Sequence, residues 1–243
     1  MIKSIAAALI VISASDALAG TLYDINFSAP PQVVNQTVRV GLAPNHPTAI
    51  GFGNPTVVPA FGHLTSQPLM FDMVGNGPSF YYDQIGLTIP VFSEPVLLAS
   101  FDFESRALVG STAGFAFIFD TPTVRTIRFD NTGHITFNSP SNSTTLGTFV
   151  DGVSGRVTIK VDQSAHTCSV LMGAALLGSA PFVPDSRIAN IRLSFGLQSS
   201  LGVPDLSAVG IDNFLITTVP EPGTITLLVL ALGVTAGLRQ RSQ

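Results

Sequence analysis

Apolar and polar residues alternate with a period of two through the middle of the chain, which predicts β-strands with one buried face. Between residues 156 and 162, valine and isoleucine occupy the odd positions, while arginine, threonine, lysine and aspartate occupy the even ones. Phenylalanine recurs in the same way at every second position of 115–120. No stretch of the core keeps a helical period over three turns. The expected strands are 22–27, 37–40, 68–73, 80–88, 96–103, 115–120, 127–129, 135–137, 145–150, 157–162, 168–172, 188–195 and 209–217.

A hairpin is expected in the middle of this pattern. Residues 127–129 lead into Asp130, Asn131, Thr132 and Gly133, after which a new alternating run begins. Gly133 can take the left-handed conformation that a short loop often needs. About a dozen short strands with one apolar face each must bury those faces against one another. The sequence therefore predicts an all-β fold, a two-sheet antiparallel sandwich.

The N-terminus has the pattern of a secretory signal peptide. Lys3 supplies a positive charge, residues 5–12 form a short apolar segment, and Ala17 and Ala19 supply the small residues of an A-x-A cleavage site. The first nineteen residues are thus expected to form a signal helix, and the mature chain should begin near Gly20.

A second apolar run, interrupted by threonine and glycine, occupies residues 225–238. Prolines before it would end a strand, and arginines after it would stay on the cytoplasmic side of a membrane. At about 1.5 Å per residue, a helix of this length spans only ~21 Å against roughly 30 Å of hydrocarbon. It is therefore expected to hold the chain temporarily. The framing residues are Pro220, Glu221, Pro222 and Gly223 before the helix and Arg239 and Arg241 after it.

These C-terminal residues resemble the PEP-CTERM sorting signal of Gram-negative surface proteins, although Gln240 interrupts the usual arginine run. The resemblance implies processing by an exosortase-type membrane protease after export with signal peptidase. The chain would be held transiently in the inner membrane and would end at the cell surface or outside the cell. It also implies three parts: a signal peptide at 1–19, a β-sandwich domain at 20–218, and a sorting signal with a short transmembrane helix at 219–243. An ordinary C-terminal anchor is the alternative.

The composition of residues 20–218 narrows the possible partners. This segment has eight basic and thirteen acidic residues, a net charge of −5, which argues against nucleic acid. A single cysteine, Cys168, leaves no intramolecular disulfide, so the core must hold the fold. Cys168 shares a strand face with Val170 and Met172, and we interpret it as a small buried hydrophobe.

A second resemblance concerns the core. The strand patterns at 115–120, 126–130, 133–135, 157–162 and 168–177 resemble the concanavalin-like jelly roll of laminin G and lectin domains. The likeness covers about half of the core and lies in strand patterns rather than site motifs. It implies a jelly-roll sandwich and no particular ligand.

Paired carboxylates give the best catalytic candidate. Asp102 and Glu104 lie at positions i and i+2 and should share one strand face, and a retaining glycosidase needs two such acids. However, the E-x-D-x-x-E run of jelly-roll glycosidases is absent, and Phe101 and Phe103 make an ordinary amphipathic strand. The sequence therefore favours a protein that is not an enzyme.

Metal binding has weak candidates. The four histidines are scattered, which disfavours zinc, and no D-x-D-x-D-G loop concentrates oxygen ligands. No cofactor is expected, but structural calcium remains open at Asp83, at Asp130 with Asn131, and at Asp212. We favour a turn for Asp130 and Asn131. Asp212 should share a face with Phe214 and needs either hydrogen bonds or an ion, and we favour hydrogen bonds.

Sugar binding usually needs exposed aromatic rings, and the best candidates for glycan contact are Tyr81 and Tyr82. Three hypotheses remain. The leading one is a non-catalytic surface or extracellular-matrix protein, sorted through its C-terminal tail and associated with exopolysaccharide or biofilm. The second is a glycan-binding module of lectin-like fold, and the third is a glycosidase.

Overall fold

Strands make up all the regular structure that the computed structural model describes, which covers residues 20–30, 32–41, 45, 47–50, 55–72, 83–90, 92, 94–120, 123–140, 142–183, 188–197 and 206–219. The strands are β1 (Gly20–Ile25), β2 (Gln36–Thr37), β3 (Ala49–Ile50), β4 (Thr56–Val57), β5 (Leu69–Asp72), β6 (Asp83–Thr88), β7 (Val96–Arg106), β8 (Ala113–Asp120), β9 (Val124–Phe129), β10 (His134–Ser139), β11 (Asn142–Thr148), β12 (Gly155–Asp162), β13 (Thr167–Met172), β14 (Ala175–Pro181), β15 (Asn190–Leu197) and β16 (Ala208–Val219). Within these ranges no helix has the length and hydropathy needed to cross a bilayer.

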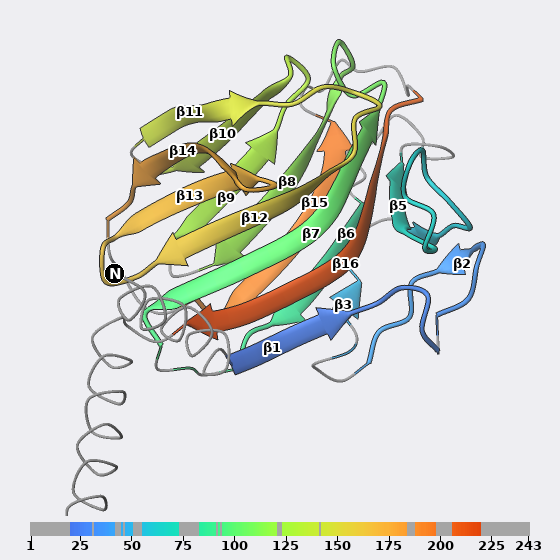
Figure 1. The fold of residues 1–243 in the computed structure, drawn as a ribbon, viewed down its shortest axis with the longest axis horizontal. Coiled ribbons are helices and arrows are strands. Elements are labelled where there is room, and N and C mark those ends of the chain that lie inside the picture. The colour runs from blue at the N-terminus through green and yellow to red at the C-terminus, as the bar shows by residue number, and fades with distance from the viewer. Residues whose placement is uncertain are drawn as a thin grey trace, which may run out of the picture.

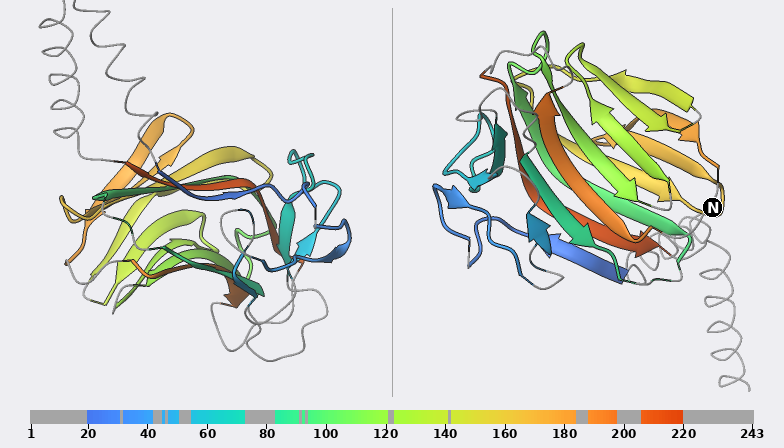
Figure 2. Two further views of the ribbon diagram at one scale, coloured as in Figure 1. Left: turned by 90° about the horizontal axis from the view of Figure 1, so that it is seen from below. Right: turned by 180° about the vertical axis from the view of Figure 1, so that it is seen from behind.

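Two antiparallel sheets form a sandwich, as the alternating pattern predicted (Figure 1). Sheet A has the order β14-β13-β12-β7-β16-β5-β4-β2, and β1 also pairs with β16. Sheet B has the order β11-β10-β9-β8-β15-β6-β3. The view from below shows the two layers one above the other (Figure 2).

Phenylalanine rings fill the space between the sheets. Phe101 of β7 is fully buried, and its ring lies within 6.5 Å of the rings of Phe103, Phe115, Phe117 and Phe214. Burial of such rings is the main favourable term in a fold without a disulfide, and offset or edge-on pairs add to it. The predicted inward positions of the alternating strands are therefore the core.

Polar side chains also link the layers at the edges of this core. The hydroxyl of Tyr23 on β1 donates to the carbonyl oxygen of Thr88 on β6, at 2.7 Å. Burial raises the pKa of Tyr23, so the phenol keeps this proton at physiological pH. At the opposite edge, Gly178 of β14 lies so close to the Leu146 backbone on β11 that an added Cβ would meet its oxygen at 2.5 Å.

The strand boundaries differ from the expected ones mainly at short or irregular elements. Of the expected strand 37–40, only Thr37 lies in a strand, β2, while β3, β4 and β14 were not predicted. The expected hairpin is present, and Gly133 has a φ of 80°. β3 and β4 have two residues each, too few to show an alternation in a sequence, and β14 buries only one of its seven positions.

Candidate functional site

The outer face of sheet A carries a cluster of polar residues where β16 is irregular. Asp212 pairs with Asp102 of β7, but Leu215 pairs with Ser100, so Asn213 and Phe214 together lie opposite one residue, Phe101. This is a β-bulge, and Asn213 takes the left-handed conformation that such an extra residue often requires, with a φ of 47°. At the same bulge β16 changes partner from β5 to β1.

The bulge corrects one prediction from the sequence. A strict period of two placed Asp212 on the same face as Phe214. The extra residue between them instead turns Phe214 into the core and leaves Asp212 beside Asp102 on the outer face. The prediction was wrong because one inserted residue reverses the alternation on one side of it.

Asp212 is nevertheless only 1% exposed, because the connection between β4 and β5 contributes Ser66 to its surroundings. The Ser66 hydroxyl donates to Oδ2 of Asp212, and the backbone N–H of Asn213 donates to Oδ1 at 2.8 Å. The favoured expectation of hydrogen bonds is thus confirmed. Burial raises the pKa of Asp212; the two hydrogen bonds oppose this effect without overcoming it, and the nearby charge of Asp102 adds to it.

The same connection covers a second carboxylate, that of Glu104. The backbone N–H of His63 donates to Oε2 of Glu104 at 2.7 Å, and Nδ1 of His63 lies 3.3 Å from the same oxygen. Phe61 packs on Gly210 of β16 so closely that an added Cβ would meet its ring at 2.5 Å. The guanidinium of Arg106 covers Phe61, 4.8 Å from the ring centroid.

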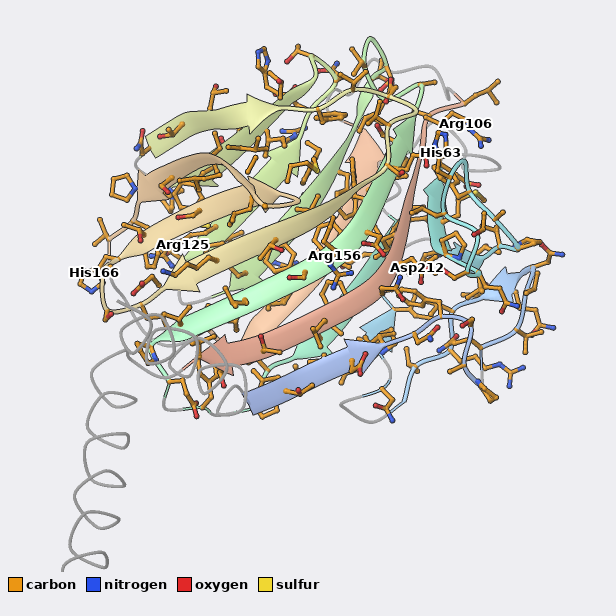
Figure 3. All side chains as sticks on the ribbon, in the orientation of Figure 1. His63, Arg106, Arg125, Arg156, His166 and Asp212 are labelled. Atoms are coloured by element: carbon orange, nitrogen blue, oxygen red, sulfur yellow. The ribbon has the colours of Figure 1, made fainter. Side chains whose placement is uncertain are left out.

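Asp102 is held from two sides. Its Oδ1 accepts from Arg156 of β12 at 3.2 Å, and its Oδ2 accepts from Nδ2 of Asn213 at 2.7 Å. Arg156 also donates to the backbone oxygen of Asn213, at 2.8 Å. Figure 3 shows Arg156 and Asp212 on the same face of sheet A. The three strands β12, β7 and β16 are therefore joined at the bulge by one hydrogen-bond network.

Asp102, Asp212, Ser66, Asn213 and Arg156 form one bulge cluster in which hydrogen bonds within the protein engage both carboxylates. Two neighbouring carboxylates in different environments are a pattern of acid-base catalysis. Here, however, each oxygen of Asp212 and each oxygen of Asp102 already accepts a hydrogen bond from Ser66, Asn213 or Arg156. Asp212 is also too buried to meet a bulky substrate such as a glycan. The cluster fixes the bulge and fastens the β4–β5 connection to the sheet.

Asp130, another calcium candidate, organises its own hairpin. Its Oδ1 accepts from the N–H and hydroxyl of Thr132 and from the N–H of His134, at 2.6 to 3.0 Å. Partial burial alone would raise the pKa of Asp130, but these hydrogen bonds outweigh it and the pKa is lowered. Asn131 donates to the backbone oxygen of Ser111 at 2.7 Å. Both residues therefore make the turn.

The remaining candidates are not brought together. Cys168 is fully buried, and burial raises the pKa of its thiol, so it is the expected small hydrophobe. Asp83 is 3% exposed and accepts from the N–H of Asp72 at 3.0 Å. Among the described residues, no three His, Cys, Asp or Glu side chains are grouped as metal ligands. The candidates that lie outside the described residues are Ala17, Ala19, Tyr81, Tyr82, Pro220, Glu221, Pro222, Gly223, Arg239 and Arg241.

Sequence reasoning missed Ser66, Asn213 and Arg156 as partners of the two aspartates. Arg156 follows Asp102 by 54 residues, and Ser66 precedes Asp212 by 146. Such pairings depend on long-range strand register, for which a single sequence has no local signal. Only Asn213 offers a hint, because asparagine is enriched at left-handed positions.

No protein-family model and no curated protein sequence matches this chain. Solved structures do resemble it in fold. A sialidase matches with a TM-score of 0.54 and 14% identity over 82% of this chain and 19% of the sialidase. An endo-β-1,4-glucuronan lyase from the fungus Trichoderma reesei matches with a TM-score of 0.53 and 14% identity, over 76% of this chain and 94% of the lyase. A structure of botulinum neurotoxin type C, whose cell entry is described as dependent on two ganglioside molecules, matches with a TM-score of 0.51 and 11% identity. The match covers 82% of this chain and 51% of the neurotoxin chain.

These likenesses concern the fold alone. The chain spans about a fifth of the sialidase and about half of the neurotoxin chain, but nearly the whole of the lyase. The neighbours are jelly-roll, concanavalin-like sandwiches, so the fold class expected from the core resemblance is confirmed.

Proposed function

We propose that this chain is an exported, non-catalytic surface or extracellular-matrix protein whose C-terminal segment directs sorting by an exosortase-type membrane protease. The pairing of β1 with β16 is the observation that carries this proposal. Gly20, which follows the expected cleavage site at Ala19, pairs with Thr218, two residues before Pro220. The sandwich therefore begins and ends beside the two expected processing points.

This arrangement suits a domain that is trimmed at both ends. Cleavage after Ala19 would leave β1 whole, and cleavage near Pro220 would leave β16 whole. β16 is paired along its length with β7 on one side and with β5 and β1 on the other. Its loss would divide sheet A, whereas removal of the segment after Val219 takes away none of the described strands.

The sorting proposal is tested by changing the motif and not the fold. In a cell that makes both processing enzymes, Glu221→Ala should leave export intact, while the unprocessed precursor accumulates in the membrane fraction. Glu94→Ala is the matched control, because it makes the same substitution outside the motif and should be processed normally. Processing of Glu221→Ala at the rate of the unchanged chain would contradict the proposal.

The bulge cluster supports a non-catalytic role, because hydrogen bonds within the protein occupy the oxygens of Asp102 and Asp212 and partly those of Glu104. We expect no release of reducing sugar from polysaccharides. The double variant Asp102→Asn, Glu104→Gln should behave like the unchanged chain in that assay. Hydrolysis by the unchanged chain that the double variant lacks would instead identify a glycosidase.

A second candidate is a glycan-binding module of the same fold. The names of the sialidase, the glucuronan lyase and the ganglioside-dependent neurotoxin all refer to carbohydrate ligands or substrates. This supports glycan binding as a role of the exported domain. Such a role is compatible with an association with extracellular polysaccharide.

A further inference from the structure

Three polar side chains at the end of β1 share one exposed face. Asp24, Asn26 and Ser28 are exposed, and they alternate with Ile25 and Phe27, which are fully buried. β1 pairs with β16 on one side, and Figure 1 shows it at the margin of the sandwich. A bulky group attached to this face would therefore extend into solvent.

The carboxamide of Asn26 is held in a fixed orientation. The backbone N–H and the hydroxyl of Ser28 donate to its Oδ1, at 2.9 and 2.6 Å, and the N–H of Ala29 donates to its backbone oxygen at 3.2 Å. This is an Asx-turn. Because a backbone N–H can only donate, the engaged atom is the oxygen, and Nδ2 lies on the far side of the carboxamide. Within the described part of the chain, no group accepts a hydrogen bond from this Nδ2.

Asn26 and Ser28 also form the N-x-S/T pattern that N-linked glycosylation requires. The pattern recurs at Asn35 and Asn142. Asn26 differs from both because an acidic residue, Asp24, stands two positions before it, whereas the other two asparagines have an apolar residue there. A carboxylate at that place gives a transferase with a basic binding groove a second, charge-assisted contact beside the Ser28 hydroxyl.

We propose that Asn26 is an acceptor for an N-linked glycan, transferred by a membrane oligosaccharyltransferase from a lipid-diphosphate-linked oligosaccharide. In the transfer, a bond forms between Nδ2 and C1 of the first sugar, while the bond between C1 and the diphosphate oxygen breaks. The electron pair of that bond leaves with the lipid diphosphate, and Nδ2 gives one proton to a base of the transferase. The product carries its glycan on the exposed face at the end of β1.

The position of Asn26 in the chain suits this modification. It follows Gly20, the expected first residue of the mature chain, so removal of the signal peptide retains it. It would also cross the membrane before β16, the pairing partner of β1, because export begins at the N-terminus. The inference rests on the export that the proposed function includes, since the lipid-linked donor is used on the outer side of the membrane.

Asn35 and Asn142 serve as internal controls. Nδ2 of Asn142 already donates to the hydroxyl of Thr144, at 3.2 Å. Asn35 has a φ of 60°, and its N–H donates to the carbonyl oxygen of Val57 at 2.6 Å, which holds its backbone against β4. Neither has the acidic residue that precedes Asn26. We expect neither to be modified.

The test expresses the full chain in a Gram-negative cell that makes an oligosaccharyltransferase and its lipid-linked oligosaccharide, and in the same cell without the transferase. Trypsin should release residues 20–39 of the exported chain as one peptide, because Arg39 is the first basic residue after Gly20. We expect this peptide to gain the mass of one glycan only where the transferase is present. The peptide contains both Asn26 and Asn35, so variants must decide between them.

Asn26→Gln and Ser28→Ala should each abolish the glycan, whereas Ser28→Thr and the matched control Asn35→Gln should retain it. Ser28→Ala keeps Asn26 and the hydrogen bond from the backbone N–H of residue 28, so it tests the pattern even if Asn26→Gln does not fold. Asp24→Ala should slow modification about tenfold, the factor that corresponds to loss of one charge-assisted contact.

The outcomes distinguish this inference from the proposed function. A glycan that persists in Asn26→Gln, or in Ser28→Ala, would belong to another residue and overturn the inference. An exported chain that has lost its signal peptide and carries no glycan in the presence of the transferase would also overturn it, while the proposed export stands. A chain that retains its signal peptide and carries no glycan would refute the export on which both depend.

Discussion

The left-handed conformation of Asn213 is a direct test of the bulge that positions Asp212. We compare Asn213→Gly with Asn213→Ala, since both remove the hydrogen bond from Nδ2 to Asp102. The two variants therefore differ mainly in the backbone conformation that residue 213 must adopt. Glycine takes a φ of 47° readily, whereas a Cβ at this φ costs about 1–2 kcal/mol.

The expected difference can be worked out from these terms. Glycine loses about 0.5–1 kcal/mol more conformational entropy than alanine on folding, which partly offsets its advantage. Asn213→Gly should thus be more stable than Asn213→Ala by about 1 kcal/mol. For a domain of roughly 200 residues this corresponds to a difference of about 2–4 °C in Tm. Relative to the unchanged chain, both variants should also lose about 0.5–1.5 kcal/mol with the hydrogen bond.

Urea unfolding followed by far-ultraviolet circular dichroism measures both differences. Parallel slopes against urea would show that the variants expose the same surface on unfolding. If Asn213→Ala were as stable as Asn213→Gly or more so, residue 213 would not be left-handed in solution. The bulge, and with it the outward placement of Asp212, would then have to be rejected.

Three further predictions concern pH and the core. The pKa of Asp212 is raised in the folded state. Its contribution to folding stability is therefore fully present below the pKa of the unfolded chain, about 3.9, and is lost as pH rises through the pKa of the folded state. Urea titrations should therefore show the unchanged chain gaining stability relative to Asp212→Asn as pH is lowered from 7 to 4. The pKa of Asp130 is lowered in the folded state. Its contribution to folding stability is therefore fully present above the pKa of the unfolded chain, about 3.9, and is lost as pH falls through the pKa of the folded state. The unchanged chain should accordingly lose stability relative to Asp130→Asn below pH 4, and a change of opposite sign in either case would contradict the assignment. Phe101→Ala should cost about 3–5 kcal/mol in the same unfolding assay because Phe101 is fully buried, whereas Val150→Ala, at 65% exposure, should stay within about 0.5 kcal/mol.

The fold class could be predicted because the sandwich buries one face of most strands. Val157, Ile159 and Val161 alternate with polar residues because every second side chain of their strand faces the core. All three are buried in the core. The Asp130 hairpin was also predictable, since its turn depends on local contacts within the five consecutive residues 130–134. Local chemistry of this kind leaves a signal within a short stretch of sequence.

The bulge cluster could not be predicted, because it depends on register between distant strands. Nothing near Asp102 in the sequence indicates that Arg156 and Asn213 would hold its carboxylate. The burial of Asp212 likewise comes from Ser66 in a connection that the alternation does not describe.

The intact mass of the mature protein, isolated from the organism that makes it, tests the proposed sorting most directly. The proposal predicts a chain that begins at Gly20, next to the paired end of β16, and that lacks residues 227–238. Sequencing of the C-terminal peptide would locate the cut near Pro220. A mature protein whose C-terminal peptide still contained residues 227–238 would contradict sorting and leave an ordinary membrane anchor in its place.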